Sequence, residues 1–203
     1  MKEYPSIYKD INNTCAVYGF DKLDGSCIRA EWNKKRGFYK FGSRTQLIDE
    51  KTPVFGEAIG LVLNTYADDL SKVFTKKKYQ EATCFLEFYG PNSFAGAHLD
   101  EPHEVTLFDV SPFKVGILPA ADFVELFGHL KIPNICFHEK INQDIIQLIR
   151  DSRLEGMTFE GIVCKAGYDK KKHLIRFKIK SNAWLNKLKT YCKGDEDLFK
   201  KLE

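Results

Sequence analysis

The sequence lacks the patterns that mark several large classes of protein. It contains no run of about 18 apolar residues and no apolar segment directly after Met1, so it predicts neither a membrane span nor a signal peptide. Its six cysteines include no C-x-x-C pair, which argues against a structural zinc site and against a secreted disulfide framework. We therefore expect an intracellular protein of the reducing cytoplasm that does not associate with membranes.

A strong excess of either charge is also missing. The chain has 31 lysines and arginines against 28 aspartates and glutamates, a formal net charge of +3, which allows a polyanionic partner without requiring one. No internal repeat, low-complexity linker or break in composition marks a domain boundary. Because 203 residues can bury one sizeable core, we predict a single domain over residues 1–203.

The sequence does contain a mixture of strand and helix patterns. Aromatic and β-branched runs predict strands at 16–20, 26–32, 83–89, 105–110, 160–164 and 174–179. Apolar residues at helical spacing predict helices within 55–70, 123–130, 145–149 and 184–191. The polar segment 167–172 is predicted to be the turn between the last two strands. Because hairpin-like pairs prevail over regular βαβ units, we expect an α+β fold with mostly antiparallel sheets flanked by helices.

Three cations alternate with apolar residues near the end of the chain. The two-residue period of a strand places Arg176, Lys178 and Lys180 on one face, about 7 Å apart, and the apolar residues between them on the other. A solvated sheet face is one interpretation of this row. A row of phosphate-binding lysines is the other.

Lys22 follows an apolar strand and precedes Asp24-Gly25, which is a turn signal. The plain interpretation is an exposed lysine at a hairpin. A lysine that acts as a nucleophile needs a lowered pKa, which partial burial and the nearby cations Lys178 and Lys180 could provide.

Two glutamates lie in or at apolar strands, Glu87 within residues 85–90 and Glu160 at the start of residues 160–165. A buried carboxylate must be paired, hydrogen-bonded or bound to a ligand or metal. Each could instead be an acid that protects an edge strand from aggregation. Two carboxylates together with several lysines suit a nucleotide bound with Mg²⁺.

In chain order, these segments resemble the motifs of the covalent nucleotidyltransferases, the superfamily of RNA ligases, DNA ligases and mRNA capping enzymes. Lys22-Leu23-Asp24-Gly25 resembles motif I (K-x-D-G), Ser43-Arg44-Thr45 motif Ia, residues 85–90 motif III, Leu107-Phe108-Asp109-Val110 motif IIIa, residues 160–165 motif IV (E-G-x-V-x-K) and residues 178–180 motif V (K-x-K). The motif III sequence F-x-E-F-x-G favours the RNA ligase branch.

The resemblance implies a nucleotidyltransferase domain, an ATP-grasp-like adenylation fold, and an ATP-dependent RNA ligase. Lys22 would attack the α-phosphorus of ATP and form lysyl-AMP, with Mg²⁺ or Mn²⁺ present. AMP would pass to a 5′-phosphate, and a 3′-hydroxyl would then displace it. The partners implied are ATP and RNA ends or nicks, as in RNA repair, with DNA-containing strands as an alternative.

The same resemblance assigns roles to individual residues. Glu160 would hold the metal, Glu87 the ribose hydroxyls and Arg44 the ribose or phosphate. Phe108 would stack on the adenine, although an aromatic residue in a strand is also a common core residue. The remaining candidates for nucleotide binding are Lys178 and Lys180 at the α-phosphate, with Asp21, Asp24 and Lys165.

Two departures from the family pattern are evident. Cys27 lies where the family often has arginine or asparagine, and Arg29 on the same strand face is a candidate substitute. The residues after Ser181 predict one amphipathic helix and a charged tail, so we expect neither an OB-fold nor a separate C-terminal domain. A partner protein that supplies substrate specificity is therefore a further expectation.

Three alternatives stay open at this point. The chain could be a capping-type guanylyltransferase or a minimal DNA ligase of the same superfamily. It could also be a nucleotide- or nucleic-acid-binding module without turnover. The short basic runs Lys76-Lys77-Lys78 and Lys170-Lys171-Lys172 are interpreted as solvated loop lysines in preference to contacts with a phosphate backbone.

Overall fold

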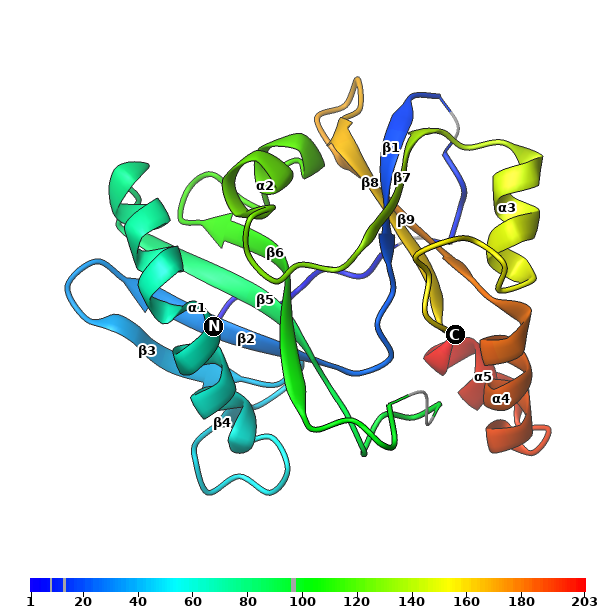
Figure 1. The fold of residues 1–203 in the computed structure, drawn as a ribbon, viewed down its shortest axis with the longest axis horizontal. Coiled ribbons are helices and arrows are strands. Elements are labelled where there is room, and N and C mark those ends of the chain that lie inside the picture. Colours follow the sequence, from blue (N-terminus) through cyan, green and yellow to red (C-terminus); the bar gives the residue numbers. More distant parts are fainter. Residues whose placement is uncertain (8, 13, 96–97) are drawn as a thin grey trace. The chain divides into compact units, whose positions relative to one another are not determined.

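The structure is a computed structural model that describes residues 1–7, 9–12, 14–95 and 98–203 (Figure 1). Its contacts divide the chain into two compact units. Unit 1 comprises Met1–Ser6, Gly25–Ser93 and His98–Ile132. Unit 2 comprises Ile7–Asp24, Phe94–Ala97 and Pro133–Glu203.

Unit 1 is built on a five-stranded antiparallel sheet with two helices. The strand order is β4-β3-β2-β5-β6, in which every neighbouring pair is antiparallel. The strands are β2 (Ser26–Asn33), β3 (Gly37–Gly42), β4 (Leu47–Ile48), β5 (Glu81–Tyr89) and β6 (Glu104–Pro112). The helices are α1 (Glu57–Lys76) and α2 (Ala120–Phe127).

The two faces of this sheet differ in chemistry because strand residues alternate. The apolar face includes Ile28, Ala30 and Trp32 of β2, and the Trp32 ring lies 5.0 Å from the ring of Phe74 in α1. The opposite face presents mostly polar side chains, which the strand register aligns across β2, β5 and β6. They are Cys27, Arg29, Glu31, Thr83, Glu87, Thr106, Asp109 and Ser111.

The first residues of the chain form a strap that bonds to this polar face. Lys2 Nζ donates to Ser111 Oγ at 2.6 Å, and the Tyr4 hydroxyl donates to Asp109 Oδ2 at 2.5 Å. Arg29 Nη1 donates to the backbone carbonyl of Lys2 at 3.3 Å. These bonds satisfy polar groups that would otherwise be costly to bury.

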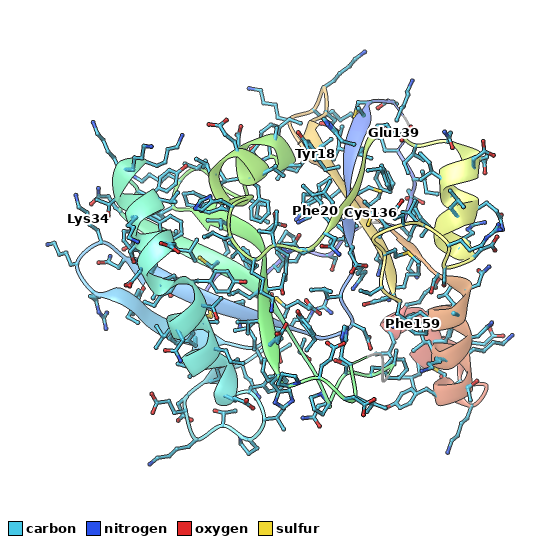
Figure 2. The ribbon with its side chains drawn as sticks, viewed as in Figure 1. Tyr18, Phe20, Lys34, Cys136, Glu139 and Phe159 are labelled. Atoms are coloured by element: carbon cyan, nitrogen blue, oxygen red, sulfur yellow. The ribbon has the colours of Figure 1, made fainter. Side chains whose placement is uncertain are left out.

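Unit 2 is built on a four-stranded antiparallel sheet of order β7-β1-β8-β9. The strands are β1 (Ala16–Asp21), β7 (Ile135–Lys140), β8 (Gly161–Tyr168) and β9 (Leu174–Lys180). The helices are α3 (Gln143–Arg150), α4 (Asn182–Cys192) and α5 (Glu196–Leu202). One sheet face packs with Ile145, Ile146 and Ile149 of α3 into a core. The other face carries Lys178, Lys180 and Phe20, of which Figure 2 labels Phe20.

The predicted α+β class and the antiparallel sheets are confirmed. Each of the six predicted strands and four predicted helical segments coincides with an observed element, and the turn after β8 is present. β3, β4, β7 and α5 are present in the structure but were not predicted from the sequence. No helix within the described part of the chain is both long and apolar enough to span a membrane.

Candidate active site

Three residues from separate motifs meet in unit 2. Lys22 Nζ donates to Glu160 Oε2 at 2.8 Å, and Lys180 Nζ donates to Glu160 Oε1 at 2.7 Å. The Glu160 carboxylate is 4% exposed, so it lies buried between two ammonium groups. This is the association that motifs I, IV and V predict.

The backbone around Glu160 explains why these side chains converge. Lys22 N donates to the carbonyl of Gly161 at 2.9 Å, and Ser181 N donates to the carbonyl of Glu160 at 3.0 Å. Gly161 has a φ of +140°, and a Cβ there would lie 2.1 Å from the carbonyl oxygen of Ile179. Only glycine allows β8 and β9 to approach this closely directly after the acid.

Burial and charge together set the ionisation of this group. Burial would raise the pKa of Glu160, but the charges and hydrogen bonds of Lys22 and Lys180 outweigh it and hold the pKa below its usual value. Burial lowers the pKa of Lys180 from 10.5 to about 8, against the attraction of Glu160 and with help from the charge of Lys22. Burial, followed by the charges of Lys22 and Lys9, also lowers the pKa of Lys178.

Asp24 connects the lysine turn to α4. Its carboxylate is 4% exposed and accepts hydrogen bonds from Ala95 N at 2.6 Å and from Trp184 Nε1 at 3.2 Å. The Trp184 ring in turn lies 3.3 Å from Lys180 Nζ, a cation–π contact. Asp24 is therefore linked to Lys180 through the Trp184 ring in this structure. Its predicted contact with the nucleotide stays a prediction.

Asp21 holds the segment that leads to Glu160. It is 3% exposed, and its Oδ1 accepts from Thr158 N at 2.9 Å and Thr158 Oγ1 at 3.2 Å. Thr158 precedes Glu160 by two residues, so these bonds position the acid. A role for Asp21 in nucleotide binding is likewise still a prediction.

Lys178 and Lys165 lie on the same sheet face as Lys180. In the register of β8 and β9, Val163 pairs with Lys178 and Lys165 pairs with Arg176. Lys178 Nζ donates to the main-chain oxygen of Glu203 at 2.6 Å. Lys165 is buried, and its Nζ lies 5.0 Å from the centre of the Phe20 ring. The predicted row of cations on β9 is thus confirmed as one face of the strand.

Unit 1 gathers a second group of predicted residues on the polar face of its sheet. Cys27 and Glu87 are direct cross-strand partners on β2 and β5. Burial, with the charge of Glu87 next, raises the pKa of the Cys27 thiol to about 12. The thiol is therefore neutral, and it contributes no charge at a position where the family that the sequence resembles often has arginine or asparagine.

Arg44 and Phe108 belong to this second group. Arg44 is exposed in the turn between β3 and β4, and its charge acts on the Cys27 thiol. Phe108 is the extra residue of a bulge in β6, because Phe85 pairs with Asp109 while Leu86 pairs with Leu107. Bulges redirect side chains, and the half-buried Phe108 ring contacts Tyr4 edge-on at 5.0 Å.

The Arg29 side chain is held in place by hydrogen bonds to backbone carbonyls. Its side chain is 3% exposed, and Nε donates to the carbonyl of Ser43 at 2.6 Å. Nη1 donates to the carbonyl of Lys2 in the strap at 3.3 Å. These bonds tie β2 to the β3–β4 turn and to the start of the chain.

The donor set around Glu160 suits a metal only in a limited way. Among the described residues, no group of three or more histidine, cysteine, aspartate or glutamate side chains could hold a metal ion. Glu160 offers two oxygens, and each now accepts from a lysine. Mg²⁺ is often bound by one or two carboxylates together with substrate phosphates and water, so a single glutamate is compatible with it.

Trp184 and Ser181 also belong to this site, although the sequence patterns did not predict them there. Ser181 is fully buried, its Oγ donates to the Phe159 carbonyl at 2.7 Å, and it accepts from Trp184 N at 3.1 Å. A serine directly before a helical pattern is an N-cap signal, which could have revealed this role. The position of the Trp184 ring at Lys180 has no comparable signal.

No family model matches the chain, and no curated protein matches its sequence. Solved structures of an RNA ligase from Naegleria gruberi do match it in fold. An apo mutant of that ligase gives a TM-score of 0.66 at 17% identity, covering 93% of this chain and 60% of that chain. A mutant with ATP and Mn and the ligase with PPi each give 0.64 at 16% identity, covering 87% of this chain and 52% of theirs.

This chain therefore spans between half and two thirds of the length of those ligase chains. The identities of 16–17% bear on the fold alone. The predicted resemblance is confirmed for the fold: the chain has the nucleotidyltransferase fold of these RNA ligases.

Proposed function

We propose that the protein is an ATP-dependent RNA ligase that acts through a lysyl-AMP intermediate. The observation that carries this proposal is Glu160, which accepts a hydrogen bond from Lys22 at 2.8 Å and from Lys180 at 2.7 Å. A lysine that follows a strand, a buried acid beside it and a second lysine that can hold phosphate oxygens are the groups that nucleotidyl transfer to a lysine needs. The fold shared with an RNA ligase supports the same activity.

In the first step, Lys22 Nζ would form a bond to the α-phosphorus of ATP. The bond from that phosphorus to the bridging oxygen would break, and pyrophosphate would leave with the electron pair. The lysine nitrogen must lose a proton to water, and Glu160 Oε2, which it already contacts, would orient the amine for attack. Lys180, with Lys178 on the same strand face, would stabilise the charge on the phosphate oxygens.

A bound divalent cation, Mg²⁺ or Mn²⁺, would supply further positive charge to the phosphates. Glu160 would hold it, exchanging a lysine partner for the metal. The similar Naegleria gruberi RNA ligase was solved with ATP and Mn, which supports ATP as the substrate of this protein and a divalent metal as its cofactor. In unit 1, Glu87 would bind the ribose, Arg44 the ribose or phosphate, and Phe108 the adenine.

Labelled nucleotides provide the test. The protein is incubated with ATP or GTP labelled at the α-phosphate, with and without Mg²⁺, and is then denatured. We expect a covalent label from ATP that depends on the metal. A label from GTP alone would instead indicate a capping-type guanylyltransferase, and no label at all would indicate a binding module.

The later steps need a separate measurement. We expect the adenylated protein to seal 5′-phosphate RNA ends or nicks, and DNA substrates of the same sequence provide the comparison. Sealing of DNA but not RNA would support the minimal DNA ligase alternative. A covalent adduct without any sealing until a second protein is added would support a partner that supplies substrate specificity.

A further inference from the structure

The turns at one end of the unit 1 sheet bring together two basic runs that lie far apart in the sequence. Lys34, Lys35 and Arg36 form the turn between β2 and β3, and Lys76-Lys77-Lys78 end α1. Lys34 N donates to the carbonyl of Gln80 at 2.9 Å, so the two runs lie side by side. All six side chains are exposed, and Figure 2 labels Lys34 at this end. We call these six residues the basic end.

Two exposed aromatic rings accompany the basic end. Arg36 lies over the ring of Tyr39, 4.2 Å from its centre, and Tyr39 is 36% exposed. Phe113 is 62% exposed, with Lys114 Nζ 5.6 Å from its ring centre. Phe113 belongs to the same end because its N–H donates to the carbonyl of Glu81, the first residue of β5.

Two glutamates at this end, Glu81 and Glu31, offset part of the charge of the six cations of the basic end. Glu81 accepts from Asn33 Nδ2 at 3.1 Å, and Glu31 accepts from the Tyr39 hydroxyl at 3.3 Å and lies 4.0 Å from Lys40. Lysines at the last turn of α1 are favoured by the helix dipole, which accounts for one run. It does not account for the second run or for the exposed rings beside it.

We propose that the basic end is a binding site for the phosphate backbone of single-stranded RNA. Cations that follow a backbone and aromatic rings that stack on bases are the combination that binds single strands without regard to sequence. The choice of RNA rests on the proposed function, but the site is separate from the candidate nucleotide-binding residues. Asn33 lies six residue positions beyond Cys27 along β2, which corresponds to about 20 Å. An RNA strand bound at the basic end would thus lie at a distance from the candidate nucleotide-binding residue Glu87, which pairs with Cys27.

The test compares three variants that each remove three positive charges. Two alter the basic end, K34Q/K35Q/R36Q and K76Q/K77Q/K78Q. The matched control, K170Q/K171Q/K172Q, alters the exposed β8–β9 turn. Binding of a labelled single-stranded RNA is measured without ATP over a range of salt concentrations. We expect each basic-end variant to weaken binding ~10-fold at low salt and to reduce the slope of log K against log salt by about 2, since each lost phosphate contact contributes about 0.7.

Single-stranded DNA should respond to these variants as RNA does, because contacts to phosphates do not read the 2′-hydroxyl that distinguishes RNA from DNA. Unchanged RNA binding in both basic-end variants, or an equal loss in the control variant, would overturn the proposal. Binding to phosphatidylserine vesicles is measured with the same variants. If the basic-end variants lose binding to the vesicles but keep binding to RNA, the proposal is overturned in favour of a membrane surface. ATP-dependent labelling of the protein is measured in parallel and should not change. If ATP labels neither the wild type nor any variant, but the basic-end variants still bind RNA more weakly, the ligase proposal fails and the proposal of an RNA-binding site stands.

Discussion

Glu160 occupies a position in which a single carboxylate faces two ammonium groups. Its burial at 4% exposure would be costly without both hydrogen bonds, which are 2.8 and 2.7 Å long. One negative and two positive charges leave an excess of positive charge at the end of β9, and Lys178 adds to it. Such an excess suits a polyphosphate ligand, which would replace the solvation that these lysines have lost.

The lowered pKa of Lys180 predicts how nucleotide binding depends on pH. Its ammonium is charged below a pKa of about 8 and becomes neutral as the pH rises through that value. We expect the affinity for α,β-methylene-ATP, which cannot release pyrophosphate, to fall above about pH 8 by up to about tenfold per pH unit. Lys180→Arg keeps its charge throughout, so its affinity should fall less than that of the wild type over the same range. Equal pH profiles for both proteins would contradict the assignment.

The two-residue periodicity of 174–181 correctly places Lys178 and Lys180 on one face. It cannot predict that Glu160 lies between Lys22 and Lys180, because that contact depends on the register of β8 against β9 and on the Lys22–Gly161 backbone bond. The ordered motifs indicated the group as a whole. The contact of Trp184 with Lys180 depends on how α4 leaves β9, which no local pattern encodes.

The close approach of β8 and β9 makes Gly161 a structural requirement. Gly161→Ala would place a methyl group 2.1 Å from the Ile179 carbonyl oxygen at a φ of +140°. We expect this change to lower the free energy of unfolding by about 2 kcal/mol or more, measured by denaturant titration. Gly167→Ala in the same strand is the control, since a Cβ there meets no atom within 4 Å. Equal stabilities for the two variants would show that the strands can separate at this point.

The bulge in β6 gives Phe108 a different role from its neighbours in the strand. If its ring stacks on adenine, Phe108→Leu should weaken α,β-methylene-ATP binding by about 5- to 150-fold, the equivalent of about 1–3 kcal/mol. Stability should change little, because the ring is only half-buried. Phe113→Leu, at a ring that is 62% exposed, should leave nucleotide affinity unchanged. A loss of stability without a loss of affinity would assign Phe108 to packing.

The elements that sequence patterns missed share weak local signals. β7 is an edge strand whose residues are half-buried or exposed, so it lacks the apolar alternation of a core strand. β4 has only two residues. α5 has seven, a length at which isolated helices are unstable, although Asp195 caps it by accepting from Leu198 N at 2.9 Å.

At the scale of the whole molecule, each unit repeats one design. A sheet packs its apolar face against helices and leaves a polar face that carries predicted site residues. Unit 2 holds Lys22, Glu160 and Lys180, and unit 1 holds Glu87 and Phe108. The division of the motifs between two compact units was not evident from composition, which has no break at their boundaries. That residues 1–203 act as one catalytic domain stays a prediction.

The central claim is that Lys22 carries the nucleotide, and peptide mapping after reaction with ATP and Mg²⁺ tests it most directly. We predict that mass spectrometry of the digested protein will find AMP on Lys22 alone. Lys22→Arg keeps a cation to pair with Glu160 but lacks the amine, so it should remain folded and carry no AMP. AMP on another residue, or undiminished labelling of Lys22→Arg, would contradict the account.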